Sequence, residues 1–268
     1  MKLNKFFSKH PVFTVAELID FLKKNGSGNR LTRTALLAHH QKQGHILSIR
    51  RGVYAVVPAG SVPQTYPVDP YLAASKMAET AVLAYHTALE FYGKAYSVYG
   101  KFIFLTDRLY LSKKFRSYQF CGVPFPKALR DKKQKFFGVN TAERSGISLK
   151  VTGMERTLVD VLDRPKLSGA WEEIWRSLEM VEFFDLDKVV KYTLLLGNAT
   201  TTAKVGFFLE QHQKALMVTG RHLKLLRKHR PKHPHYMVRR SRKEGRFLSD
   251  WNLVVPLRIF ERSWQEVT

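Results

Sequence analysis

The apolar positions of the first sixty residues follow a helical spacing twice and then change to strand spacing. Thr14 and Glu17 have the separation of a capping box, which predicts that a helix begins there. Val15 and Leu18 open an apolar stripe that continues at helical spacing. The glycine-containing run 23–29 closes this first helix, because glycine adopts the left-handed backbone common at helix ends.

A second helix is predicted from a cap at Thr32 to about Gln43. On a wheel of 100° per residue its inward side carries Leu36, Leu37 and His40. The opposite side carries Thr34, Ala35, Ala38, Gln41 and Lys42. Small alanines there would let the backbone approach base edges, and the polar side chains could read a major groove.

Two strands, 45–50 and 53–57, are predicted around the tight basic turn at Arg51 and Gly52. Helix, turn, helix and basic hairpin in this order predict a winged helix-turn-helix, which reads DNA. We expect base contacts from the outward helix face, and phosphate contacts from Arg33 and the hairpin turn. The expected DNA interface comprises Thr32, Arg33, Thr34, Ala38, Gln41, Lys42, Arg50, Arg51 and Tyr54.

The same order of elements also occurs in small domains that bind protein, and an Arg-Arg pair is often a solvated turn. The net charge favours DNA. The chain has 45 Lys and Arg against 22 Asp and Glu, a formal net charge of +23, which makes a polyanion the expected partner. A second basic surface is predicted in the run 221–246, formed by Arg221, Lys224, Arg227, Lys228, Arg230, Arg239, Arg240, Arg242, Lys243 and Arg246.

A proline-rich segment, 58–63, predicts a linker, so we expect a DNA-binding domain at 1–60 and a larger mixed α/β domain at 61–268. A further boundary near residue 153 is an option. Short β-prone runs between 99 and 153 predict a small sheet, and a last strand is expected at 252–256. A helical layer is predicted from the segments 70–79, 82–92, 154–162, 170–183, 186–196 and 203–212. The fold class expected is therefore α+β.

Candidate catalytic groups all have simpler interpretations. Asp160 and Asp163 are expected to form helix-surface ion pairs, and Asp185 to cap a helix. His86 is interpreted as a histidine bonded inside a helix packing, because no carboxylate or hydroxyl partner can be assigned to it. Cys121 stands alone among apolar neighbours, which predicts a buried thiol and excludes an internal disulfide.

No phosphate-binding loop and no Gly-x-Ser-x-Gly motif occur in the chain. The four histidines between 222 and 235 lie among Lys and Arg, which disfavours a bound cation. We therefore expect no catalysis, no metal and no cofactor. No long apolar run and no signal peptide are found, so a cytoplasmic protein is expected, associated with the nucleoid when bound to an operator.

Four segments together resemble the AbiEi-type antitoxins of type IV, abortive-infection toxin–antitoxin systems. They are RRGVY at 50–54, AYHTALEFYG at 84–93, ERTLVDVLDRP at 155–165 and KVGFFLE at 204–210. Their order and spacing carry the resemblance, which covers most of the chain.

The resemblance implies a transcriptional autorepressor that binds inverted repeats in double-stranded DNA through its winged domain. It also implies a partner toxin of the nucleotidyltransferase type, which the chain would counter either by binding it directly or by reversing its effect. The resemblance leaves the oligomeric state open, and two copies pairing on DNA is one option. Two alternatives remain: a protein that binds RNA or DNA without sequence choice, in the manner of a chromatin protein, and a metal-dependent nuclease acting through Asp160 and Asp163.

Overall fold

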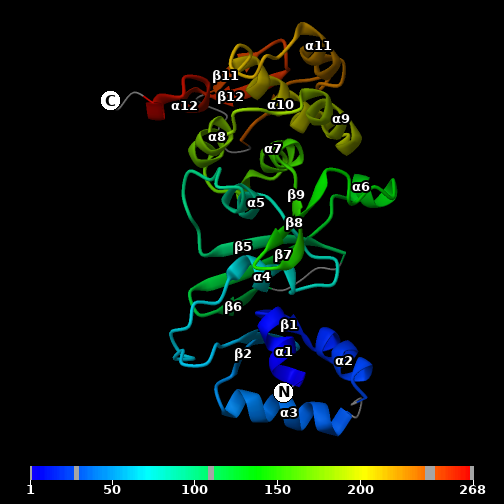
Figure 1. Ribbon diagram of the computed structural model, residues 1–268. Helices are drawn as coiled ribbons and strands as arrows, with labels where there is room; N and C mark the ends of the chain where they lie inside the picture. Colours follow the sequence, from blue (N-terminus) through cyan, green and yellow to red (C-terminus); the bar gives the residue numbers. More distant parts are fainter. Residues whose placement is uncertain (1, 27–29, 108–111, 239–244, 266–268) are drawn as a thin grey trace. The chain divides into compact units, whose positions relative to one another are not determined.

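A computed structural model of the chain describes residues 2–26, 30–107, 112–238 and 245–265 (Figure 1). It is mixed α+β with several small sheets, so the predicted fold class is confirmed at that level. Its residues form two compact units. Unit 1 comprises Met1–Leu83, Gly100–Pro124 and Thr141–Val151, and unit 2 comprises the remaining residues. The predicted boundaries at residues 60 and 153 stay predictions.

The N-terminal part of unit 1 surrounds a small core of aromatic and aliphatic side chains. Its elements are α1 (Lys2–Lys9), β1 (Val12–Thr14), α2 (Val15–Lys24), α3 (Arg30–Lys42), β2 (Ile46–Arg50) and β3 (Val53–Val56). The strands form an antiparallel sheet in the order β1-β3-β2. Phe6, Phe13, Leu18 and Leu37 are buried between the helices and this sheet. The first helix and the first strand of this part were not predicted.

The starts of α2 and α3 and the β2–β3 turn can each be compared with the sequence-based prediction. Thr14 and Glu17 form the predicted capping box, with Glu17 Oε2 accepting from Thr14 N at 2.7 Å. The predicted cap at Thr32 is wrong, because Arg30 and Leu31 are already helical and Thr32 therefore lies inside α3. Gly52 sits in the β2–β3 turn at φ +85°, a left-handed conformation that suits glycine.

The second part of unit 1 is a six-stranded sheet. Its order is β6 (Lys113–Phe115), β7 (Tyr118–Pro124), β5 (Lys101–Thr106), β4 (Val82–Leu83), β9 (Ile147–Thr152) and β8 (Val139–Arg144). The small sheet predicted between residues 99 and 153 is therefore confirmed. Helix α4 (Pro70–Ser75) packs on it and begins after Asp69, whose carboxylate accepts from the backbone N–H groups of Tyr71 and Leu72.

The prediction of one helix over 82–92 is wrong. Val82 and Leu83 are fully buried and pair with Leu105 and Phe104 of β5, so tertiary pairing overrides the local pattern. Tyr85 then takes φ +57°, which turns the chain before α5 (His86–Phe91) begins.

Unit 2 is mainly helical. Besides α5 it contains α6 (Lys127–Asp131), α7 (Met154–Asp163), η1 (Pro165–Leu167), α8 (Trp171–Glu179), α9 (Leu186–Leu196), α10 (Ala199–Gln211), α11 (Gly220–Lys228), β10 (His235–Tyr236), β11 (Gly245–Leu248), β12 (Leu253–Pro256), α12 (Leu257–Phe260) and η2 (Ser263–Gln265). Helix α9 has its predicted bounds, whereas the helix predicted over 170–183 is shorter. Trp175 and Trp251 are completely buried in its core. Within the described ranges, no helix is both long and apolar enough to cross a membrane.

Candidate nucleic-acid interface

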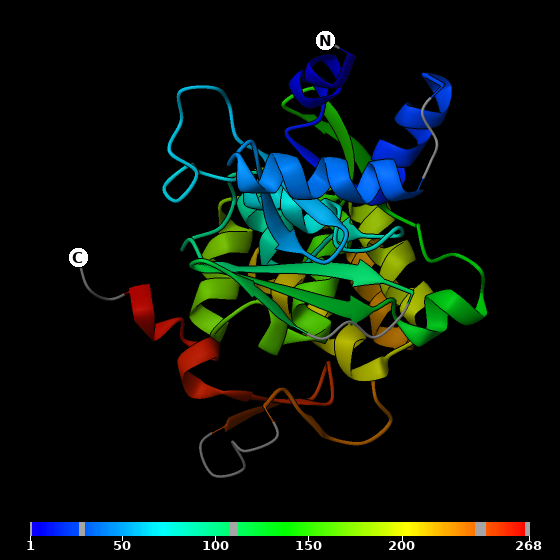
Figure 2. The same ribbon diagram turned by 90° about the horizontal axis from the view of Figure 1, so that it is seen from below.

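Helix α3 exposes the side that the hydrophobic pattern predicts. Thr34, Ala35, Ala38, Gln41 and Lys42 are all exposed. On the opposite side Leu37 is 9% exposed and packs into the core, and Leu36 and His40 are half-buried. Viewed from below, α3 lies in the foreground as a long helix (Figure 2). Its polar side is therefore open to solvent along several turns.

The other residues predicted to contact DNA from this helix and hairpin differ in how exposed their side chains are. Arg33 is half-buried in the first turns of α3. Tyr54 is half-buried and stacks on Phe13 with ring centroids 5.6 Å apart, so its ring packs against the core of this part. The side chain of Thr32 lies outside the described part of the structure.

The two arginines of the β2–β3 turn have different roles. Arg50 Nη2 donates to the carbonyl oxygen of Met77 at 2.6 Å, and Arg50 is half-buried. Arg51 is exposed at the turn. The expected DNA interface contained both arginines. In the structure, Arg50 holds the hairpin to the chain after α4, whereas Arg51 presents its charge to solvent.

The second basic surface is described only in part. Arg239, Arg240, Arg242 and Lys243 lie outside the described residues. Arg221, Lys224 and Lys228 are exposed on α11, and Arg246 is exposed with its guanidinium 4.3 Å from the centre of the Phe260 ring.

Two further arginines of that surface are engaged within unit 2. Arg227 forms ion pairs with Glu210 at 2.5 Å and with Asp250 at 3.2 Å. Arg230 donates to the carbonyl oxygen of Asp250 at 2.9 Å. Together with Lys224, Lys228 and Lys232, these arginines line a shallow hollow at the end of α11.

Asp160 is not a helix-surface residue, so that expectation is wrong. It is 1% exposed and pairs with Arg156, also 1% exposed, at 3.1 Å. Tyr192 donates to its other oxygen at 2.6 Å. Helix α7 buries residues 156–162 on all sides, which the spacing of its apolar residues does not reveal. Asp163 is half-buried and forms the expected ion pair, with Arg164 at 3.6 Å; it also accepts hydrogen bonds from Asn198 and Thr201.

His86 also has partners that the sequence could not assign. Its Nε2 lies 3.0 Å from Glu173 Oε1 and its Nδ1 lies 3.1 Å from Glu90 Oε1. The ring stacks on Tyr99 at 4.1 Å. Burial opposes ionisation of Glu173, but hydrogen bonds led by those from Ser97 outweigh it and hold its pKa below the ordinary value. The histidine is buried, as predicted, inside a network of carboxylates.

Cys121 is half-buried in β7, whereas a buried thiol was expected. Its Sγ lies 3.5 Å from Ser112 Oγ. Asp185 caps α9 by accepting from Lys188 N at 3.1 Å, as predicted. Among the described residues, no group of three or more His, Cys, Asp or Glu is arranged to hold a metal ion.

Comparison with known proteins gives a fold relationship. No family model matches the chain, and no curated protein matches it. Its structure is similar to the crystal structure of the RV2827C protein from Mycobacterium tuberculosis, with a TM-score of 0.62 over 99% of this chain and 94% of that chain. The two sequences are 17% identical, so the likeness shows a shared fold.

Proposed function

We propose that this protein is a DNA-binding transcriptional autorepressor that acts as the antitoxin of a toxin–antitoxin system. One observation is the main support for DNA binding: Thr34, Ala38, Gln41 and Lys42 are all exposed along one side of α3. The helices α2 and α3 and the hairpin β2–β3, with Arg51 at its turn, have the element order of a winged helix-turn-helix.

In this proposal the two parts of the interface do different work. Gln41 and its neighbours on α3 read base edges in the major groove, where amide and hydroxyl groups recognise donor and acceptor patterns. Arg51 contacts a phosphate or the minor groove and supplies affinity without sequence choice. The operator is double-stranded DNA with inverted repeats upstream of the protein's own operon.

The antitoxin part rests on the resemblance of the four sequence segments to the AbiEi-type antitoxins. The partner in this proposal is a toxin of the nucleotidyltransferase type. Co-expression tests it: the product of the neighbouring reading frame should arrest growth alone and should not do so together with this chain. Growth arrest that this chain does not relieve would contradict the antitoxin assignment.

DNA binding is tested by fluorescence anisotropy with the upstream region and with a scrambled duplex of the same length. The Arg51→Ala variant should weaken binding to both duplexes and flatten the plot of log affinity against log salt by about 0.9, the contribution of one phosphate contact. Gln41→Ala should weaken binding to the operator and leave the scrambled duplex unaffected. Lys113→Ala, an exposed change in β6, is the control and should alter neither.

Two other outcomes favour the alternatives. Equal affinity for operator and scrambled DNA would support binding without sequence choice. Magnesium-dependent cleavage that disappears in Asp163→Asn would support the nuclease. Arg50→Ala would not isolate a DNA contact, because it also removes the hydrogen bond to Met77 that holds the hairpin.

A further inference from the structure

The shallow hollow of about 730 Å³ at the end of α11 has a charged lining that is entirely basic. The described residues that line it include no Asp or Glu and no aromatic side chain. They all belong to unit 2 and are Gly220, Lys224, Arg227, Lys228, Arg230, Pro231, Lys232 and Asn252. This basic hollow therefore offers positive charge and no surface on which a base could stack.

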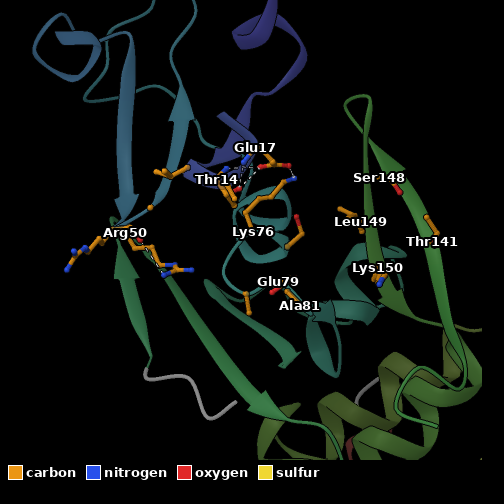
Figure 3. A pocket seen from close by; sticks show the side chains of 16 residues that line it. Thr14, Glu17, Arg50, Lys76, Glu79, Ala81, Thr141, Ser148, Leu149 and Lys150 are labelled. Carbon is orange, nitrogen blue, oxygen red and sulfur yellow. Dashed lines mark hydrogen bonds and ion pairs between the residues drawn. The ribbon is translucent and has the colours of Figure 1, made fainter. Parts of the chain in front are cut away.

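A cavity in unit 1 differs in this respect (Figure 3). Glu17 and Glu79 line it together with cations, and Glu17 forms an ion pair with Lys76. That cavity contains part of its own counter-charge, whereas the described lining of the basic hollow supplies none.

The two arginines of the basic hollow are held in place by the chain itself. Arg227 is ion-paired with Glu210 and Asp250. Arg230 donates to the carbonyl oxygen of Asp250 at 2.9 Å, and Asn252 donates to a backbone carbonyl of the turn after α11 at 2.8 Å. These contacts fasten the turn after α11 to the segment before β12, so the site needs no ligand to assemble it.

The three lysines of the basic hollow are the groups that can hold a ligand. Lys224, Lys228 and Lys232 are exposed, and no acidic group in the described part of the chain lies within ion-pair distance of them. Lys224 and Lys228 are four residues apart on α11, which places their Cβ atoms about 5–6 Å apart on one side of the helix. Like charges at this spacing repel each other, so an anion that bridges them relieves an unfavourable contact.

The size and chemistry of the basic hollow favour a chain of phosphates over a single ion. Its volume lies in the range of sites for whole small molecules, roughly 300–1,000 Å³. Lysine ammonium groups bind phosphate as point charges, which suits a repeating backbone that can lie in more than one register. Without an aromatic lining residue the site recognises the phosphates and not the bases.

We infer that the basic hollow binds consecutive phosphate groups of a linear polyanion through Lys224, Lys228 and Lys232. Two sources carry that chemistry: the sugar–phosphate backbone of a nucleic acid, and inorganic polyphosphate. The inference goes beyond the proposed operator binding, because this site lies in unit 2 and makes no choice among bases.

Fluorescence anisotropy of the full chain with a labelled oligothymidylate tests the site, since a single strand lacks the major groove that α3 would read. At about 0.1 M salt, the combined variant Lys224→Gln, Lys228→Gln and Lys232→Gln should bind this strand at least ~10-fold more weakly. Its plot of log affinity against log salt should flatten by about 2, because each phosphate contact of a single strand contributes about 0.7.

The matched control removes the same charge from exposed positions of unit 2 outside the hollow. It combines Lys127→Gln, Lys166→Gln and Lys214→Gln. This control should change the affinity less than ~2-fold at about 0.1 M salt, where charges more than about 10 Å apart are largely screened.

Isothermal titration calorimetry with inorganic polyphosphate distinguishes the two sources. Polyphosphate binding that depends on the three hollow lysines would show that phosphate groups alone suffice. Lysine-dependent binding of the strand without binding of polyphosphate would identify the nucleic-acid backbone as the ligand.

Three results would overturn the inference. They are no binding of either polyanion, equal weakening in the two triple variants, and binding of inorganic phosphate as tightly as polyphosphate at the same phosphate concentration. The operator test of α3 uses a duplex and other residues, so each proposal can fail while the other stands.

Discussion

The buried Arg156–Asp160 ion pair gives the sharpest test of the interior of unit 2. The side chains are 0% and 1% exposed, and Arg156 Nε lies 3.1 Å from Asp160 Oδ2. Arg156 Nη1 also donates to the carbonyl oxygens of Lys135 at 2.9 Å and Phe137 at 2.7 Å. Replacing Asp160 by alanine therefore leaves a guanidinium charge in the interior with only neutral partners.

The expected cost follows from that arrangement. Removing one member of a buried ion pair costs about 3–5 kcal/mol, and we expect Asp160→Ala to lower the free energy of unfolding by that amount. Tyr192→Phe removes one hydrogen bond to the same carboxylate and keeps the ion pair, so it should cost about 1.5–3 kcal/mol. The exposed Asp187, 3.5 Å from His222, is the control, and Asp187→Ala should cost at most about 1 kcal/mol.

Urea unfolding followed by tryptophan fluorescence measures these costs in the right part of the chain. The four tryptophans, at positions 171, 175, 251 and 264, all lie in unit 2, so the signal reports on that unit. A cost below about 1 kcal/mol for Asp160→Ala, or a larger cost for Tyr192→Phe, would refute the reasoning, because an unpaired buried charge must cost more than one lost hydrogen bond.

Two further predictions concern packing and pH. A Cβ atom at Gly206 would lie 2.1 Å from the buried ring of Trp251, so Gly206→Ala should destabilise unit 2 by about 1–3 kcal/mol in the same urea assay. Gly220→Ala, where no atom lies within 4 Å of the added Cβ, should be neutral, and equal effects would contradict the packing argument. Burial raises the pKa of Glu17, but hydrogen bonds from Lys76 and Thr14 outweigh it, so the pKa is lowered from 4.5. Since the folded-state pKa lies below the unfolded one, the stabilisation is present above 4.5 and is lost as pH falls further. Hydrogen-exchange protection of the α2 amides should therefore fall as the pH drops below 4.5, and less so in Glu17→Gln; parallel losses in the two proteins would contradict this.

Local patterns predicted the local features well. The capping box at Thr14, the cap at Asp185 and the exposed side of α3 each depend on residues within a few positions of one another. Helix periodicity and capping act over that range, so the sequence contains enough information for them.

Features that depend on distant residues could not be predicted in this way. Arg50 bonds to Met77, and His86 pairs with Glu173, which lies 87 positions away. Val82 becomes a strand residue only because β5 lies beside it. The periodicity of apolar residues describes one helix or strand at a time. It therefore showed whether these residues are polar or apolar, but it could not identify the distant partners that determine their roles.

The exposed side of α3 is itself poor in charge. Among the outward residues that the structure describes as exposed on that helix, Lys42 is the only cation, and Thr34, Ala35, Ala38 and Gln41 are neutral. Phosphate contacts set the salt dependence of DNA binding, whereas neutral polar groups choose among base pairs. If α3 reads DNA, its preference for one sequence over another must therefore be nearly independent of salt concentration. The steep salt dependence of DNA affinity expected for a chain of net charge +23 must then come from cations outside that helix face. Affinity and sequence choice are then separable by mutation.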